Sequence, residues 1–289
     1  MKAVSILKQV RGILAVIFAG ICALLSPLPS SNSQATLVSQ KQYVLDEAFA
    51  AGQGLATDGT YFYTSGAISK LYMTALSKID TETGNVVEKN LSALPSEFTK
   101  KGYDHIGAIS LRGDIIYAPV EHRSNKDPLV LLFDKNTLEY TGTYFSLDQT
   151  YLYDGIPWCA VDEDNGLLYT SPFHHPNYIL AYNLDDMSFV KKIDTSCELD
   201  RVQGGVYHDG KLYLNLDPMN PKNKKEVKAV DVLTGEVSDF FSRNVTGPFG
   251  CETEGITLNF TSEGKMQVVI ADYDKTVCVF IRTYEIEKA

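Results

Sequence analysis

The chain has 289 residues, and its 36 acidic residues outnumber its 26 basic residues, which gives a formal net charge of −10. Its one cluster of lysines, between Lys222 and Lys228, lies in a segment with proline and asparagine and forms no basic stripe. Since nucleic-acid binding needs such a positive surface, we expect no nucleic-acid partner.

The N-terminal segment has the pattern of a secretory signal. Lys2, Lys8 and Arg11 precede a short apolar stretch from Gly12 to Leu25, and small and polar residues ending at Ala35 follow it. The stretch is shorter than the about 20 residues that span a bilayer comfortably. We therefore predict a signal peptide at 1–35, cleaved from one domain at 36–289, and a secreted or periplasmic protein with no membrane attachment after cleavage. A retained anchor is the alternative.

One sequence pattern recurs five times in the rest of the chain. A polar residue leads into a short strand, a tight turn with glycine follows, and an aromatic or aliphatic strand comes next. The polar residues that open the copies lie 49 to 52 residues apart and are here named the axial residues: Gln53, His105, Asp154, Gln203 and Glu254. A period of this size is typical of stacked or radial repeat folds.

Each copy predicts four strands. The turns Asp58-Gly59, Asn165-Gly166 and Asp209-Gly210 stand between β-prone runs, which favours a hairpin at the start of a copy. A second pair of strands follows, as at 76–80 and 86–87 in the first copy. Four strands per repeat form a propeller blade, so the fold class is all-β, a five-bladed β-propeller. Six blades would need a degenerate repeat, for which the chain has no long enough gap.

The last copy lacks a fourth strand. It runs from Glu254 through a strand near 277–286, whereas an unassigned strand precedes the first copy at Gln42–Leu45. We therefore predict that residues near 42–48 pair with the strand near 277–286 and close the ring, which leaves no open sheet edge at the junction.

Propeller geometry places the axial residues around one mouth of the central channel. The ends of the second strands open on the same face and add Glu121, His174 and Asp272, while Trp158 offers a stacking wall. We predict catalytic roles for His105, Asp154 and Glu254, and ligand contacts from Gln53, Glu121, Trp158, His174 and Gln203. The structural alternative is that Asp154 and Glu254 accept hydrogen bonds from backbone amides, and that glycines 54, 155, 204 and 255 allow close approach of backbones.

A metal site and disulfides are two further expectations. Asp154 and Glu254, with a histidine nearby, predict a Ca²⁺ or Zn²⁺ site, and oxygen-rich ligation favours Ca²⁺. The predicted mature chain keeps Cys159, Cys197, Cys251 and Cys278, an even number that permits two disulfides or four free thiols.

Two blades resemble the plant and bacterial type of glutaminyl-peptide cyclotransferase. The first blade does so through Gln53-Gly54-Leu55 and Tyr63-Thr64-Ser65-Gly66, and the fourth through Gly210-Lys211-Leu212-Tyr213-Leu214-Asn215. The resemblance implies a five-bladed propeller, cyclotransferase-like activity and a site role for Gln53. Where the family carries its acidic glutamate in the second blade, this chain has Asp104-His105-Ile106-Gly107, and it has one tryptophan where the family has several.

Three functions fit these patterns. The first is an enzyme that acts on a small polar or peptide-like ligand, by cyclotransferase-like or hydrolytic chemistry, as a monomer. The second is a propeller that binds ligands or proteins without catalysis. The third is a glycoside hydrolase that pairs Asp154 with Glu254, or Glu121 with Asp272, at about 5–9 Å. The sequence contains no serine nucleophile elbow, P-loop or dinucleotide fingerprint.

Overall fold

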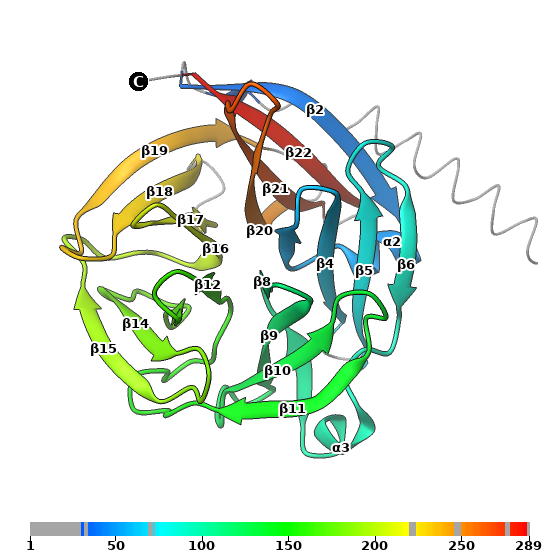
Figure 1. Ribbon diagram of the computed structural model, residues 1–289, viewed down its shortest axis with the longest axis vertical. Coiled ribbons are helices and arrows are strands. Elements are labelled where there is room, and N and C mark those ends of the chain that lie inside the picture. The colour runs from blue at the N-terminus through cyan, green and yellow to red at the C-terminus, as the bar shows by residue number, and fades with distance from the viewer. Residues whose placement is uncertain are drawn as a thin grey trace, which may run out of the picture.

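The computed structural model describes residues 30–31, 34–68, 71, 73–219, 224–245, 250–274 and 278–287. Five antiparallel sheets stand around a central axis like the blades of a propeller (Figure 1). The prediction of an all-β, five-bladed fold is confirmed.

The blades follow one another in chain order. Blade 1 contains β3 (Leu55–Thr57), β4 (Tyr61–Ile68), β5 (Met73–Asp80) and β6 (Val86–Asn90). Blade 2 contains β7 (Tyr103–Ile106), β8 (Ser110–Arg112), β9 (Ile115–His122), β10 (Leu129–Asp134) and β11 (Tyr140–Ser146). Blade 3 contains β12 (Ala160–Asp162), β13 (Leu167–Thr170), β14 (Tyr178–Asn183) and β15 (Phe189–Asp194).

Blades 4 and 5 receive strands from the N-terminal segment. Blade 4 contains β16 (Val202–His208), β17 (Lys211–Leu216), β18 (Lys225–Asp231) and β19 (Val237–Asn244), and β1 (Ser30–Ser31) pairs with β19. Blade 5 contains β20 (Cys251–Phe260), β21 (Met266–Asp274), β22 (Cys278–Ile286) and β2 (Ala35–Val44). Two short helices, α2 (Asp46–Ala50) and α3 (Ser96–Thr99), lie between strands.

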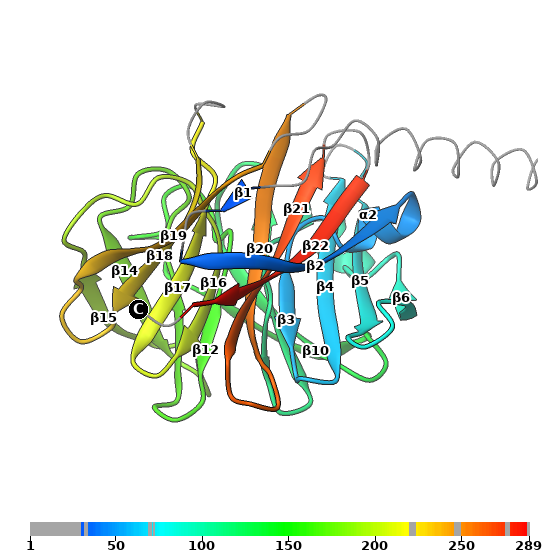
Figure 2. The ribbon, with the colours of Figure 1, turned by 90° about the horizontal axis from the view of Figure 1, so that it is seen from above.

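The ring closes through β2. This strand pairs antiparallel with β22 from Ala35 opposite Ile286 to Val44 opposite Cys278, and Figure 2 shows the two side by side. The predicted closure is confirmed, but the strand ends at Val44 rather than near residue 48. Leu45 has a positive φ of 58°, which takes the chain out of the extended conformation, and α2 follows.

The signal-peptide prediction stays a prediction, because residues 1–29 lie outside the described residues. Ala35 is the first residue of β2 and is buried, so cleavage after it would leave Thr36–Val44 to close the ring. The described part of the chain contains no helix that is long and apolar enough to cross a membrane.

Glycines bring the innermost backbones into contact. A Cβ on Gly54 would lie 2.7 Å from the Ile109 nitrogen, and one on Gly204 would lie 3.1 Å from the Gly255 Cα. A side chain on Gly255 would overlap the backbone of Gly54 and Leu55. The predicted close approach is therefore confirmed for glycines 54, 204 and 255.

Hydrogen bonds join the same segments across blades. The Gly255 amide donates to the Gln53 carbonyl oxygen at 2.6 Å, and the Ala108 amide donates to the Pro157 carbonyl oxygen at 2.8 Å. The Asn215 side chain donates to the Glu254 carbonyl oxygen, also at 2.6 Å. Neighbouring blades thus fix the backbone beside several axial residues.

A buried ion triad joins blade 4 to blade 5 and, within blade 5, links β22 to β2. The fully buried Asp272 accepts from Arg243 at 2.9 Å and from Arg282 at 2.7 Å, and Arg282 also donates to Gln40 of β2 at 2.7 Å. Burial alone would raise the pKa of Asp272, but the two guanidinium groups outweigh it and lower that pKa. This corrects the proposed catalytic pair of Glu121 with Asp272, because both Asp272 oxygens are bound by arginines.

The four cysteines predicted in the mature chain are free thiols. Cys159 and Cys278 are buried, Cys251 is half-buried, and Cys197 is exposed. Of the two alternatives from the sequence, the structure has free thiols rather than disulfides.

Removal of the triad's carboxylate should destabilise the fold strongly. We expect Asp272→Ala to lower the free energy of unfolding by about 3–5 kcal/mol, because it leaves two buried arginines without their counter-ion. Asp46→Ala, which removes an exposed ion pair with Lys89, should cost about 1 kcal/mol or less. Urea denaturation of both variants measures the difference, and equal losses would contradict a structural role for the triad.

Candidate functional site

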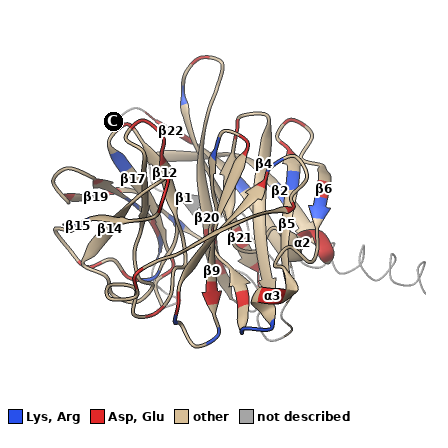
Figure 3. Cartoon of the chain, turned by 60° about the horizontal axis from the view of Figure 1, so that its bottom comes forward, with Lys and Arg blue, Asp and Glu red and all other residues tan. Residues whose placement is uncertain are grey.

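All five axial residues line one pocket of about 230 Å³ at the propeller axis. Further residues of blades 2, 3 and 5 complete its wall, and the full lining is Gln53, His105, Glu121, Asn125, Asp154, Pro157, Phe173, Gln203, Glu252 and Glu254. The acidic end of β9, which carries Glu121, is red in Figure 3. The structure therefore brings together the side chains that the repeat pattern singled out.

Irregularities in the strand pairing lie next to several of these side chains. The ladder register shifts beside His105 in β7, beside Gln203 in β16 and around Glu254 in β20. A β-bulge bends its strand and re-aims a side chain, and bulges are frequent next to functional sites. The regular spacing in the sequence gives no sign of these bulges.

Glu121 and His105 are neighbours in the pocket. The Nε2 atom of His105 lies 3.8 Å from Oε2 of Glu121, and their side chains are 24% and 18% exposed. Burial, reinforced by the negative charge of Asp154, raises the pKa of Glu121 to about 8. Burial lowers the pKa of His105 to about 4. At neutral pH, Glu121 therefore holds a proton and His105 is uncharged.

Gly155 leaves the space that Glu121 occupies. A Cβ at this position would overlap Oε1 of Glu121, and the positive φ of 101° favours glycine on its own. The sequence predicted that Gly155 allows close approach of backbones, but its close neighbour is this side chain. The two residues come from different blades, so the sequence does not show that they meet.

Asp154 is held by the loop that follows β13. Its two carboxylate oxygens accept the backbone amides of Phe173 at 2.8 Å and of His174 at 2.7 Å. This is the structural alternative that the sequence left open. Asp154 therefore fixes the loop that places the Phe173 ring at the pocket.

Glu254 is almost completely buried, with 2% of its surface exposed. Burial raises its pKa well above the usual range, and the nearby Glu252 and Asp217 add to this effect. Arg201 and Lys225 act in the opposite direction without cancelling it. The environment of Glu254 thus favours its neutral form over its charged form.

Two predicted ligand contacts lie away from the pocket lining. Trp158 is fully buried in the core, where its indole nitrogen donates to the Ser171 hydroxyl at 3.1 Å and its ring packs over Gly205. It therefore forms no stacking wall. His174 is exposed and contributes its backbone amide to Asp154, while the neighbouring Phe173 lines the pocket.

Asn125, Pro157 and Glu252 also line the pocket, although the sequence pattern did not predict them. Glu252 lies two residues before Glu254, and the two-residue period of a strand could have indicated that both share a face. Asn125 follows β9 in a turn with a positive φ of 53°, which the sequence does not reveal.

The arrangement of donors does not fit the predicted Ca²⁺ or Zn²⁺ ion. Both Asp154 oxygens accept amide hydrogens, and the pKa of Glu254 favours its neutral form. Within the described ranges, no group of three or more His, Cys, Asp or Glu side chains is placed to hold a metal. We therefore assign no chemical step to a metal.

Comparisons with known proteins support the fold. No protein-family model matches the sequence, and no curated protein matches it. The tail fibre of the Staphylococcus aureus phage P68 is similar in structure, with a TM-score of 0.57 and 13% identity over 88% of this chain and 52% of the fibre chain. This chain thus spans about half the length of that protein.

Weaker similarities extend to other solved structures. The WD40 repeats of RRP9 give a TM-score of 0.42 and 12% identity, covering 85% of this chain and 62% of that chain. Hydrazine synthase of Kuenenia stuttgartiensis also gives 0.42, with 15% identity, covering 77% of this chain and 56% of that chain. At these identities and scores, neither identifies a function.

Removal of the Asp154 carboxylate should loosen the loop after β13. We expect Asp154→Ala to lower the free energy of unfolding by about 1–3 kcal/mol, because two amide hydrogens lose a charged acceptor. Asp185→Ala, at an exposed ion pair with Arg112, is the control and should cost about 1 kcal/mol or less. Thermal melts compare the two variants, and equal stability would rule out this role for Asp154.

The raised pKa of Glu121 should appear as pH-dependent stability. The folded state keeps a proton that the unfolded state releases near pH 4.5, so the resulting stabilisation is complete below that pH and is lost as the pH rises through about 8. Between pH 6.5 and 8, His105 is neutral in the folded state, and the protons that it releases in the unfolded state affect the wild type and Glu121→Gln alike. There we expect the wild type to lose about 1–2 kcal/mol more stability than Glu121→Gln. Denaturation at several pH values measures this, and parallel pH profiles would show that Glu121 has an ordinary pKa.

Proposed function

We propose that this chain is an exported propeller that binds a small polar or peptide-like ligand in its axial pocket and transfers protons to it through Glu121. The observation that carries the proposal is the convergence of the axial residues and Glu121 in one small pocket, with the pKa of Glu121 raised to about 8. A carboxyl group with such a pKa holds a proton at neutral pH and can release it during a reaction. The N-terminal sequence pattern supports export.

The lining favours a ligand with uncharged polar groups or a cationic amine. Gln53 and Gln203 offer both amide donors and acceptors, while the protonated Glu121 can donate to a carbonyl oxygen or a leaving nitrogen. No lysine or arginine lies among the described residues of the lining, so an anion would lack a counter-charge. A volume of about 230 Å³ accommodates one residue-sized group rather than a long chain.

Cyclisation of an N-terminal glutaminyl residue is the reaction that we propose. The ligand's amino nitrogen attacks its side-chain carbonyl carbon, a carbon–nitrogen bond forms, and the bond to the amide nitrogen breaks. Glu121 gives its proton to the departing nitrogen, which leaves as ammonia, and regains one from the attacking amine. The resemblance at Gln53 supports this choice, while Glu121 in β9 supplies the acid at a different position from the family's second-blade glutamate.

A propeller that binds without catalysis is the second candidate. It is favoured by the two backbone amides on Asp154, because they give a predicted catalytic carboxylate a structural role. Under this alternative, the pocket keeps its ligand selectivity and Glu121 donates a hydrogen bond without transferring the proton.

Ammonia release from a glutaminyl dipeptide tests the reaction. We expect the wild type to release ammonia at a rate that falls as the pH rises through about 8, because Glu121 then loses its proton. Glu121→Gln should lower this rate about 10²–10⁴-fold. Glu88→Gln, an exposed position in β6, is the matched control and should keep the wild-type rate.

Binding separates the two candidates. If the wild type releases no ammonia but the dipeptide shifts the His105 ring signals in NMR spectra, the pocket binds without this reaction. If the dipeptide produces neither ammonia nor a shift, the proposed ligand class is wrong.

A further inference from the structure

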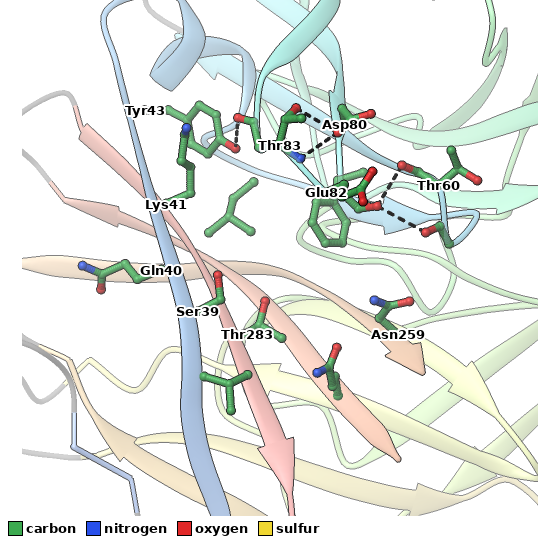
Figure 4. Close-up of a pocket in the computed structure, with 17 residues that line it drawn as sticks. Ser39, Gln40, Lys41, Tyr43, Thr60, Asp80, Glu82, Thr83, Asn259 and Thr283 are labelled. Carbon is green, nitrogen blue, oxygen red and sulfur yellow. Dashed lines mark hydrogen bonds between the residues drawn. The ribbon is translucent and has the colours of Figure 1, made fainter. Parts of the chain in front are cut away.

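A second and larger cavity lies at the junction of blade 5 and blade 1. It has a volume of about 770 Å³ and is here named the seam groove, formed by β2, the β20–β21 hairpin, β22 and the turns of blade 1 (Figure 4). It shares no lining residue with the axial pocket. Asn259 of the groove lies near the far end of β20, whereas Glu254 of the pocket lies near its start, so the two cavities occupy different ends of that strand.

The groove is lined mainly by uncharged polar side chains. Asn259, Gln267 and Thr283 line it from neighbouring strands of blade 5, and within the described residues their side chains make no hydrogen bond. Thr60 lines the opposite side from blade 1, and Figure 4 shows it across the groove from β2. Amides and hydroxyls that face a cavity without protein partners are available to a ligand, and each of these groups both donates and accepts.

An irregularity in β2 adds an apolar surface. The register of β2 against β22 shifts between Leu37 and Ser39, so Val38 is the extra residue of a bulge. Val38 is 49% exposed and lines the groove, together with Phe62 and Ile281. The groove therefore combines an aliphatic patch with polar groups on both of its sides.

The charges exclude other ligand classes. Lys41 is the one cationic side chain in the described lining, and the carboxylates of Asp80 and Glu82 oppose it. The Asp80 carboxylate is already engaged, because it accepts the Thr83 amide at 2.7 Å and the Thr83 hydroxyl at 2.8 Å. An anionic ligand would therefore meet net repulsion. A hydrophobic peptide would need deep apolar pockets, which this lining does not provide.

We propose that the seam groove is a binding site for a neutral oligosaccharide. Sugar hydroxyls donate and accept at closely spaced positions, which matches the amides and hydroxyls of Asn259, Gln267, Thr283 and Thr60. The C–H face of a sugar ring packs on the aliphatic patch of Val38. The volume falls within the about 300–1,000 Å³ that is usual for ligand sites and accommodates several sugar units.

An array of immobilised neutral and anionic oligosaccharides, probed with the full chain, tests the proposal. We expect binding to neutral oligosaccharides that weakens at least tenfold in Asn259→Ala/Gln267→Ala. Asn136→Ala removes an exposed amide from the β10–β11 turn of blade 2 and should bind like the wild type. Val38→Asp changes the aliphatic patch without touching the amides and should also weaken binding, which keeps the test decisive if the double variant does not fold.

The outcomes separate this site from the axial pocket. Retained oligosaccharide binding in Glu121→Gln supports a separate site, whatever the result with the glutaminyl dipeptide. The proposal is overturned if no neutral oligosaccharide binds, if anionic ones bind better, or if folded seam-groove variants bind like the wild type.

Discussion

The close approach of five backbones at the propeller axis is the constraint on which the rest of the structure depends. A Cβ on Gly54 or Gly255 would clash with neighbouring backbone, and one on Gly204 would be tightly packed against Gly255. Hydrogen bonds such as that from Gly255 to Gln53 cross between blades. Side chains have little or no space at these positions, and the polar residues that precede the three glycines in the sequence line the axial pocket. A ring of equivalent positions thereby becomes a single small site.

Crowding at the axis also determines the chemistry of the site. Four acidic side chains, Glu121, Asp154, Glu252 and Glu254, line a pocket of about 230 Å³. Carboxylates this close in a desolvated space cannot all ionise without a large cost, so the structure resolves the conflict in two ways. Asp154 receives two amide hydrogens, whereas the pKa values of Glu121 and Glu254 are raised, which favours their neutral forms.

The sequence predicted the features that follow from repetition. Spacing identified five blades, the closing strand and the axial residues, because equivalent positions in a ring must converge. It could not predict contacts between unlike positions, such as Glu121 beneath Gly155, nor the bulges at His105, Gln203 and Glu254. It also misplaced Trp158, since an aromatic residue next to an axial position can lie in the core as well as in a pocket. Asp272 was misread because its partners Arg243 and Arg282 lie on other strands, 29 and 10 residues away in the sequence.

The two cavities follow from the same radial geometry. Near the axis the blades converge, so a pocket there is small, desolvated and able to shift pKa values. Toward the rim the blades diverge, and the junction between blade 5 and blade 1 leaves the wider seam groove, which is lined mainly by uncharged polar side chains. Proton transfer needs the first environment, and recognition of an extended, hydroxyl-rich ligand needs the second. Distance from the axis therefore separates the proposed site of proton transfer from the proposed oligosaccharide site, within one repeated architecture.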